Sequence, residues 1–229
     1  ATQGVTMSAV TAATGATLAR TSMVSPLQAQ KPQVVAVNGE LTSTGLNAGD
    51  AQKGFGLWIM PLYQSNNVWG MKAGEFKTGY TSDLGGVAIG ADYTIDDMLR
   101  FGLSLNLGGG YAQSQGDFNK TDNSFNFWGV NAYGGWTYNN FGLIADIGYT
   151  STYNKVKQEL STSMEMSDIK SDITGSAFAA GLRGEYKFST SAVDIIPHVS
   201  VRYTGLKTDS YDAKSGGTVF SAEESFQNI

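Results

Sequence analysis

The sequence predicts an all-β membrane protein, a transmembrane antiparallel up-and-down β-barrel, and three observations support this fold class. The segment Leu99–Tyr111 (LRFGLSLNLGGGY) alternates between apolar side chains and small or polar ones. Tight turns alternate with long polar connections between the expected strands. The composition is rich in Gly and aromatic residues and poor in charge.

The alternation in Leu99–Tyr111 gives the strand two different faces, because successive side chains point to opposite sides. One face carries leucines and aromatic rings, whereas the other has no bulk that could build a packed core. A strand needs this pair of faces when lipid lies on one side and a water-filled lumen on the other. The three glycines at 108–110 precede no Lys-Ser/Thr pair of a phosphate loop, so we expect them to leave room for neighbouring rings or a helix.

Composition narrows the class of protein further. The 229 residues include 29 Gly, and charged residues make up 15%, whereas about a quarter is usual. A mean hydropathy of -0.17 argues against the large apolar core of a soluble domain. The sequence has no apolar run of the roughly 18 residues that a membrane helix needs, which excludes a helical membrane protein. A net charge of -5 argues against a nucleic-acid partner, and one His without any Cys argues against a metal site.

Three regions are expected along the chain. Residues 1–25 are mostly small side chains and Thr with no Pro, which predicts a slim helix. If residues 2–23 are helical, the helix is about 33 Å long and matches the hydrocarbon thickness of a bilayer. It is too polar to face lipid and suits a polar lumen; a disordered Thr/Ala linker is the alternative. Residues 26–53 have little periodicity and are expected to connect the helix to a barrel region at 54–229.

Seven strands are expected in the barrel region, and the fourth is the least regular because Phe127 and Trp128 put bulk on both faces. The expected strands are Phe55–Tyr63, Leu84–Tyr93, Leu99–Tyr111, Phe125–Tyr138, Phe141–Tyr153, Phe178–Phe188 and Val193–Thr204. Tight turns are expected at Thr94–Met98, Asn139–Asn140 and Ser189–Ala192, and long polar loops at Ser65–Ser82, Gln113–Asn123, Glu159–Asp172 and Asp209–Ser225. In outer-membrane barrels the short turns are periplasmic and the long loops extracellular.

The alternation assigns side chains to faces of the barrel wall. The lipid-facing set is predicted to be Leu99, Phe101, Leu103, Leu105, Leu107, Leu143, Ile147, Leu182, Val199 and Val201. The polar set facing the lumen is predicted to be Asp92, Arg100, Asp146, Arg183, Glu185, Lys187, Asp194, His198 and Arg202. Aromatic rings near the strand ends are expected at the two membrane interfaces: Tyr93, Tyr111, Tyr138, Phe141, Tyr149, Tyr186, Phe188 and Tyr203.

Seven strands do not close a bacterial barrel, because single-chain barrels use even numbers from eight upward. An eight-stranded barrel is filled by its own side chains, so a lumenal helix requires a wider one. The segment Ser225–Ile229 stands at about the start of a possible eighth strand. We therefore expect this sequence to be a fragment of a larger barrel.

Several segments resemble the β-domain of autotransporters, the translocator barrels of type V secretion. Residues 56–63 (GLWIMPLY) look like the first barrel strand of that family. Residues 80–93 (YTSDLGGVAIGADY) are similar to its Gly-rich second strand, which ends in Gly-Ala-Asp-Tyr. LRFG at 99–102 and PHVSVRY at 197–203 are also similar to family features, so the resemblance covers about residues 54–208.

The resemblance implies a twelve-stranded barrel in the Gram-negative outer membrane, of which this chain carries about seven strands, truncated at the C-terminus. It implies a helix that threads the lumen and joins an upstream passenger, which the barrel helps to deliver to the cell surface and to anchor there. The implied partners are outer-membrane lipid, the passenger and the barrel-assembly machinery, with no cofactor and no catalysis. The helix region contains no Asn or Asp, so the self-cleavage chemistry of some members cannot be carried over.

Two alternative functions stay open at this point. A surface adhesion barrel would bind ligands through the long loops, and it would lack a lumenal helix. An outer-membrane lipid hydrolase would use His198 and Ser200, which are two residues apart on one strand face. Because that face is predicted to point into the lumen, away from lipid, a hydrogen-bonded lumenal His is the simpler interpretation.

Overall fold

The structure is a computed structural model that describes residues 2–22, 33–35, 54–73, 76–95, 98–116, 119–160, 168–189, 193–215 and 218–228. Most of the expected connecting segment 26–53 lies outside the described residues, as do residues 23–25 of the expected helix and residues 190–192 of one expected turn.

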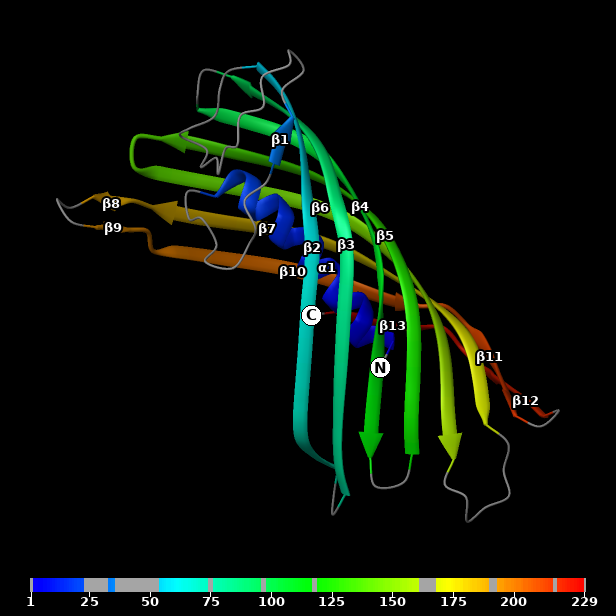
Figure 1. The fold of residues 1–229 in the computed structure, drawn as a ribbon. Helices are drawn as coiled ribbons and strands as arrows, with labels where there is room; N and C mark the ends of the chain where they lie inside the picture. The colour runs from blue at the N-terminus through cyan, green and yellow to red at the C-terminus, as the bar shows by residue number, and fades with distance from the viewer. Residues whose placement is uncertain are drawn as a thin grey trace.

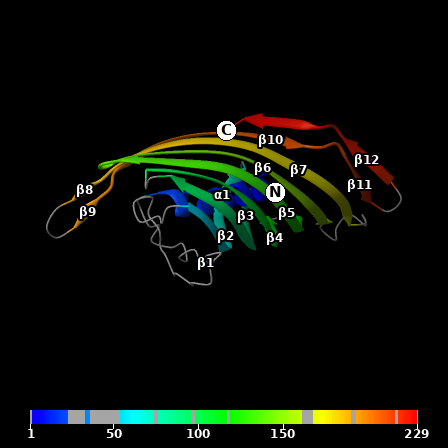
Figure 2. The ribbon, with the colours of Figure 1, turned by 90° about the horizontal axis from the view of Figure 1, so that it is seen from above.

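Most strands of the described chain form one curved antiparallel sheet with a single helix on its concave side, and two short strands form a separate two-stranded sheet (Figures 1 and 2). The helix is α1 (Thr2–Thr21), and β1 (Gln33–Val35) pairs with the first long strand. The long strands are β2 (Gly54–Ala73), β3 (Phe76–Ile95), β4 (Leu99–Gly116), β5 (Asn119–Tyr138), β6 (Phe141–Leu160), β7 (Ile169–Tyr186) and β10 (His198–Thr208). The short strands are β8 (Phe188–Ser189), β9 (Asp194–Ile195), β11 (Tyr211–Ser215), β12 (Thr218–Ala222) and β13 (Ser225–Asn228).

The predicted fold class is confirmed. The sheet order β1-β2-β3-β4-β5-β6-β7-β10-β13 follows the chain from one neighbour to the next, as an up-and-down barrel requires. The seven long strands correspond to the seven expected ones, and β13 lies where an eighth was expected to begin. In the described part of the chain the sheet is open. Among the described residues, no helix is both long enough and apolar enough to span a membrane.

Three of the four connections expected to be long polar loops, Ser65–Ser82, Gln113–Asn123 and Asp209–Ser225, are largely strands, so for them the prediction was wrong. In the fourth, Glu159–Asp172, residues 161–167 lie outside the described residues. The ladder between β2 and β3 continues from Ser65 through Ala73, and the ladder between β4 and β5 reaches Gln115. The range Glu159–Asp172 begins inside β6 and ends inside β7, and Asp209–Ser225 contains the β11–β12 hairpin. A strand end such as 120–124 (KTDNS) carries polar residues in succession and shows no alternation, whereas backbone hydrogen bonds need none. We call the outer ends of the pairs β2–β3, β4–β5 and β6–β7, together with the β11–β12 hairpin, the polar hairpins. They lie at the end of the sheet opposite Asn139–Asn140.

The expected strand Val193–Thr204 is also interrupted. Residues at its start form β9, which pairs with β8, and the long strand β10 begins only at His198. Pro197 explains the break because proline has no N–H to donate to a ladder. Its carbonyl still accepts a hydrogen bond from the Tyr186 amide at 3.1 Å.

The concave face is bulkier than the sequence pattern indicated. Trp58, Phe125, Phe127 and Tyr133 are buried there together with Val5 and the alanines of α1. Glycines make room for these rings: a Cβ at position 108 or 110 would lie 2.5 Å or 2.7 Å from the ring of Phe127 or Phe125. The expected role of these two glycines in accommodating neighbouring rings is confirmed.

Replacing Gly90 by Ala should destabilise the fold by about 1–3 kcal/mol, the usual cost of overpacking a filled core. The new Cβ would lie 2.2 Å from the Trp58 indole. Equilibrium unfolding in urea, followed by tryptophan fluorescence in detergent micelles, measures the change. Gly85→Ala on the same strand is the matched control because nothing lies within 4 Å of its new Cβ. Equal stability of the two variants would contradict this packing.

Candidate functional site

The internal helix runs from the polar hairpins toward the tight turns. Near its start, the Thr6 and Thr152 hydroxyls lie 2.8 Å apart, and the Asn66 amide donates to the Ser8 hydroxyl at 3.1 Å. Its last turn lies beside Asp92 near the end of β3 and Arg100 near the start of β4. The charged contacts of the helix gather at the tight-turn end, which makes this end the candidate functional site.

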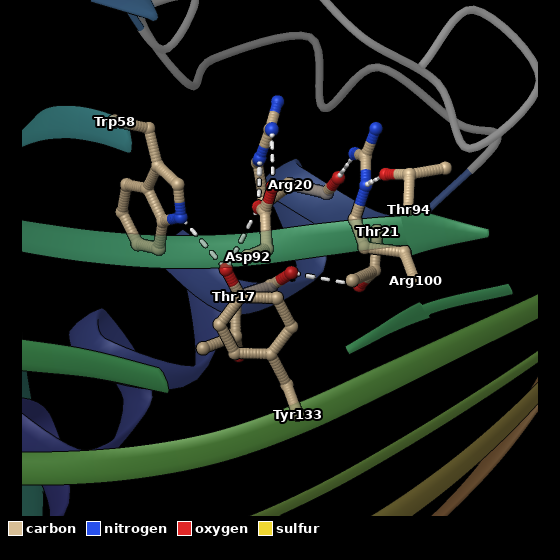
Figure 3. Close-up of polar contacts among 8 residues, drawn as sticks. All are labelled: Thr17, Arg20, Thr21, Trp58, Asp92, Thr94, Arg100 and Tyr133. Carbon is tan, nitrogen blue, oxygen red and sulfur yellow. Dashed lines mark hydrogen bonds and ion pairs between the residues drawn. The ribbon is translucent and has the colours of Figure 1, made fainter. Parts of the chain in front are cut away.

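The central contact is an ion pair between Arg20 and Asp92. The guanidinium Nη2 donates to Asp92 Oδ1 at 2.8 Å, and Nε donates to Oδ2 at 2.5 Å (Figure 3). Arg20 is 2% exposed and Asp92 is 3% exposed. Two parallel hydrogen bonds fix the geometry of such a pair as well as its energy. The pair therefore ties the last turn of α1 to the barrel wall.

Two aromatic side chains complete the surroundings of the Asp92 carboxylate. The Tyr133 hydroxyl donates to Asp92 Oδ2 at 3.0 Å and accepts from the Trp58 indole N–H at 2.7 Å (Figure 3). A buried charge is tolerated only when its remaining hydrogen-bonding positions are filled. The chain Trp58–Tyr133–Asp92–Arg20 meets that need with residues from β2, β5, β3 and α1.

Arg100 binds the end of the helix in a different way. Its Nη1 donates to the main-chain carbonyl of Arg20 at 2.7 Å, and its Nε donates to the Thr94 hydroxyl at 3.1 Å. The last carbonyls of a helix lack partners within the helix and carry its negative partial charge. A buried cation at this point satisfies one carbonyl and stabilises the helix end. We call Arg20, Asp92, Arg100 and Tyr133 the helix anchor.

A second acidic group holds the residue after the helix. The Ser22 hydroxyl donates to the Glu185 carboxylate, and Arg183 Nε lies 2.7 Å from the same carboxylate. Two glycines leave space beside the helix: a Cβ at Gly56 would lie 3.0 Å from Asp92 Oδ1, and one at Gly135 would lie 3.4 Å from Thr21. The wall is thus shaped around the end of the helix from several strands.

The structure brings only some of the polar residues predicted for the lumen to the helix. Asp92, Arg100 and Glu185 are buried against it, and Arg183 pairs with Glu185. Asp146 and Arg202 pair at 2.6 Å. Lys187 and Asp194 pair with each other at the base of the β8–β9 hairpin.

His198 and Ser200 are exposed on β10, where they alternate with Val199 and Val201 and share a side with the buried Thr204. This places the two residues on the concave side. In the part of the chain that the structure describes, no group of three His, Asp or Glu side chains could hold a metal ion.

The residues predicted to face lipid and the membrane interfaces are all exposed. Leu103 on the convex face is 66% exposed, and its chain neighbour Ser104 is 5% exposed. The predicted lipid-facing residues Leu99, Phe101, Leu105, Leu107, Leu143, Ile147, Leu182, Val199 and Val201 are exposed as well. So are the predicted interface rings Tyr93, Tyr111, Tyr138, Phe141, Tyr149, Tyr186, Phe188 and Tyr203.

Sequence reasoning missed Arg20, Ser22, Trp58 and Tyr133 as partners of this site. Arg20 carries a weak signal, because it is the only charged residue in the predicted helix region. A charged side chain on a helix inside a narrow lumen is buried, so it needs an oppositely charged partner on the barrel wall. Trp58 and Tyr133 give no such signal, because sequence alone does not place β2 and β5 opposite the same point of β3.

A curved sheet with an apolar convex face and a helix held along its concave face defines an outer-membrane β-barrel with an internal helix. The family model described as autotransporter β-domain matches residues 57–228. The chain therefore belongs to the autotransporter β-domain family, whose translocator barrels reside in the Gram-negative outer membrane.

The structure is similar to the translocator domain of autotransporter NalP from Neisseria meningitidis, with a TM-score of 0.60 and 14% sequence identity. The match covers 79% of this chain and 60% of the NalP chain, so it shows the shared fold, and this chain spans about three fifths of that domain. A comparison with curated proteins found no significant match.

Asp92→Ala should destabilise the protein by about 3–5 kcal/mol because it leaves the buried Arg20 without its counter-charge. Urea unfolding measures the loss, and limited trypsin digestion reports whether the peptide bond after Arg20 becomes accessible. Asp194→Ala is the control: this carboxylate is exposed and paired with Lys187, so its loss should leave the unfolding midpoint nearly unchanged. The double variant Arg20→Met/Asp92→Leu should recover part of the stability. Equal effects of Asp92→Ala and Asp194→Ala would contradict the anchor.

Proposed function

We propose that this chain is a translocator barrel that inserts in the outer membrane, helps to deliver an upstream passenger to the cell surface and anchors it there. The observation that carries the proposal is the direction of α1. Its N-terminal end lies toward the polar hairpins and its C-terminal end lies at the tight turns. A polypeptide joined before Thr2 would therefore leave the barrel at the hairpin end.

The orientation in the membrane follows from the two ends of the sheet. Short turns lie on the periplasmic side of outer-membrane barrels, and longer extensions lie outside the cell. The β5–β6 connection is the two-residue turn Asn139–Asn140, whereas the opposite strand ends are polar well beyond the ring of Tyr111. We place the hairpins at the cell surface and the helix anchor near the periplasmic opening. The exposed apolar residues of the convex face then meet hydrocarbon.

In this function the helix anchor fixes the helix after transport. The bidentate Arg20–Asp92 pair and the Arg100 contact hold the last turn, so the helix cannot slide outward without breaking buried charged contacts. The work of the domain is then transport and attachment without catalysis, and folding with the barrel-assembly machinery supplies the driving force.

The two alternatives fit the structure less well. A lumenal helix is the feature that distinguishes a translocator from an adhesion barrel, and α1 lies on the concave face. A lipid hydrolase would need His198 and Ser200 on the convex side, and they lie on the opposite side.

The assignment of faces is tested by labelling single cysteines in the protein reconstituted in vesicles. Leu103→Cys should react with a maleimide that partitions into the bilayer and resist a charged, water-soluble one, because Leu103 is 66% exposed on the convex face. Ser104→Cys, the matched control one residue along the strand, should resist the bilayer reagent. If the bilayer reagent labels Ser104→Cys, the faces are reversed.

Passenger delivery is tested with an epitope tag fused before Ala1 in the full-length protein, expressed in a Gram-negative host. Protease added to intact cells should remove this tag, because residues before the helix emerge at the hairpin end. The same tag inserted between Asn139 and Asn140 should be digested only after the outer membrane is permeabilised. Protection of the first tag in intact cells would refute delivery, provided that the barrel itself is shown to be inserted.

A further inference from the structure

A row of lysines crosses three neighbouring strands at the hairpin end. Lys157 on β6 lies directly opposite Lys170 on β7, and Lys170 lies directly opposite Lys214 on β11. Lys155 stands two residues away from Lys157 on the same side of β6. Lys155 and Lys157 alternate with the inward residues Asn154 and Val156 and so share the convex side with Tyr149 and Tyr153. We call Lys155, Lys157, Lys170 and Lys214 the lysine row.

This arrangement is unfavourable by itself, because like charges directly opposite one another in a sheet repel. Lys157 has carboxylate partners, Glu159 at 3.0 Å and Asp168 at 3.1 Å. Lys155, Lys170 and Lys214 form no ion pair with any carboxylate among the described residues. Lys155 lies directly opposite Asp172, so Lys170 and Lys214 are the described pair that face each other without an ion pair.

The lysine row surrounds an open hollow of about 480 Å³. Two carboxylates, Asp172 and Asp212, also line it, so the lining holds four positive charges against two negative ones. The Asp212 carboxylate already accepts a hydrogen bond from the Ser221 hydroxyl at 2.7 Å. With Glu159 and Asp168 beside Lys157, four carboxylates stand near the four lysines. Among the described residues, the lysines that lie opposite one another without an ion pair are Lys170 and Lys214, and beside them the hollow has room for an anionic group.

The level of the lysine row on the wall indicates which anion it meets. Along β6 the row lies two to four residues beyond Tyr153, which corresponds to roughly 7–13 Å of strand. Tyr149 and Tyr153 belong to the exposed aromatic residues that mark the membrane interface. Headgroups occupy roughly the next 5–8 Å on each side of the hydrocarbon. Because strands of such barrels tilt by about 35–45°, the row rises roughly 5–11 Å above Tyr153 and overlaps the headgroup layer on the outward face.

We propose that the lysine row binds the phosphate groups of the phosphorylated glycolipid that forms the outer leaflet of the outer membrane. Lysine ammonium groups are common phosphate ligands, and a basic cluster beside a membrane span attracts anionic headgroups. Bound phosphate relieves the repulsion between the opposed lysines. The inference rests on the orientation given under the proposed function, but it does not depend on a passenger.

The test measures binding of bisphosphorylated lipid A to the full-length protein in detergent by native mass spectrometry. Lys170→Gln/Lys214→Gln should weaken binding by about thirtyfold, and each single variant by about fivefold, since each lysine near a charged surface contributes about 1 kcal/mol. Lys120→Gln/Lys207→Gln is the matched control: it removes the same charge at the same end, from lysines that have carboxylate partners. Lipid A stripped of both phosphates should bind the unaltered protein as weakly as bisphosphorylated lipid A binds the double variant.

Three outcomes would overturn the proposal. These are equal binding by Lys170→Gln/Lys214→Gln and the unaltered protein, an equal loss in the control pair, and tight binding of lipid A without phosphates. Inorganic phosphate is a further probe: if it binds the row as tightly as lipid A, the site takes free phosphate and the lipid assignment is wrong. A heat-modifiable band on gels verifies that each variant is folded. A protein that fails to deliver its passenger yet binds lipid A through these lysines leaves this inference intact.

Discussion

The constraint on which this structure depends is the hydrogen bonding of the backbone in hydrocarbon. No water can satisfy an N–H or C=O group there, so each strand must pair on both sides over its membrane-spanning part. The long strands between β2 and β10 meet this demand with neighbours that follow one another along the chain, whereas the described sheet is open at the outer edges of β2 and β10. Side chains are then free to differ on the two faces, with leucines outside and a mixture of polar residues, small residues and a few large rings inside. The curvature that results creates the concave face on which the helix lies.

The contacts between α1 and the barrel wall differ between the middle and the end of the helix. The middle of α1 packs through small residues such as Ala9 and Ala16, against Trp58 and Phe127. Its end is held by buried charges on β3 and β4. Apolar contacts between smooth surfaces are non-directional, whereas a bidentate ion pair fixes both position and rotation. The anchor therefore decides where the helix stops, and the packing fills the space around it.

Sequence reasoning predicted the fold well where one physical rule acts alone. The alternation of Leu99–Tyr111 is imposed by lipid on one side, so it identified β4 and its outward residues directly. It failed where a strand end carries polar residues in succession, as at 120–124 of β5 (KTDNS), because backbone pairing leaves no mark in the side chains. It also failed at β10, where Pro197 was placed inside a strand that begins one residue later. In the anchor, Asp92 and Arg100 belong to the polar set predicted for the lumen, but their partners come from α1, β2 and β5, and only the three-dimensional arrangement reveals them.

The polar side chains of the concave face support one further step of synthesis. Ser104 and Asn106 are buried on the inward side of β4, where they alternate with the exposed Leu103, Leu105 and Leu107. Burying an amide or a hydroxyl costs free energy unless it is hydrogen-bonded, so a wall that only packed against a helix would favour apolar residues here. Amides and hydroxyls on this side instead suit the polar interior of an outer-membrane barrel. The directional contacts at Asp92 and Arg100 then hold the helix where apolar packing alone would not.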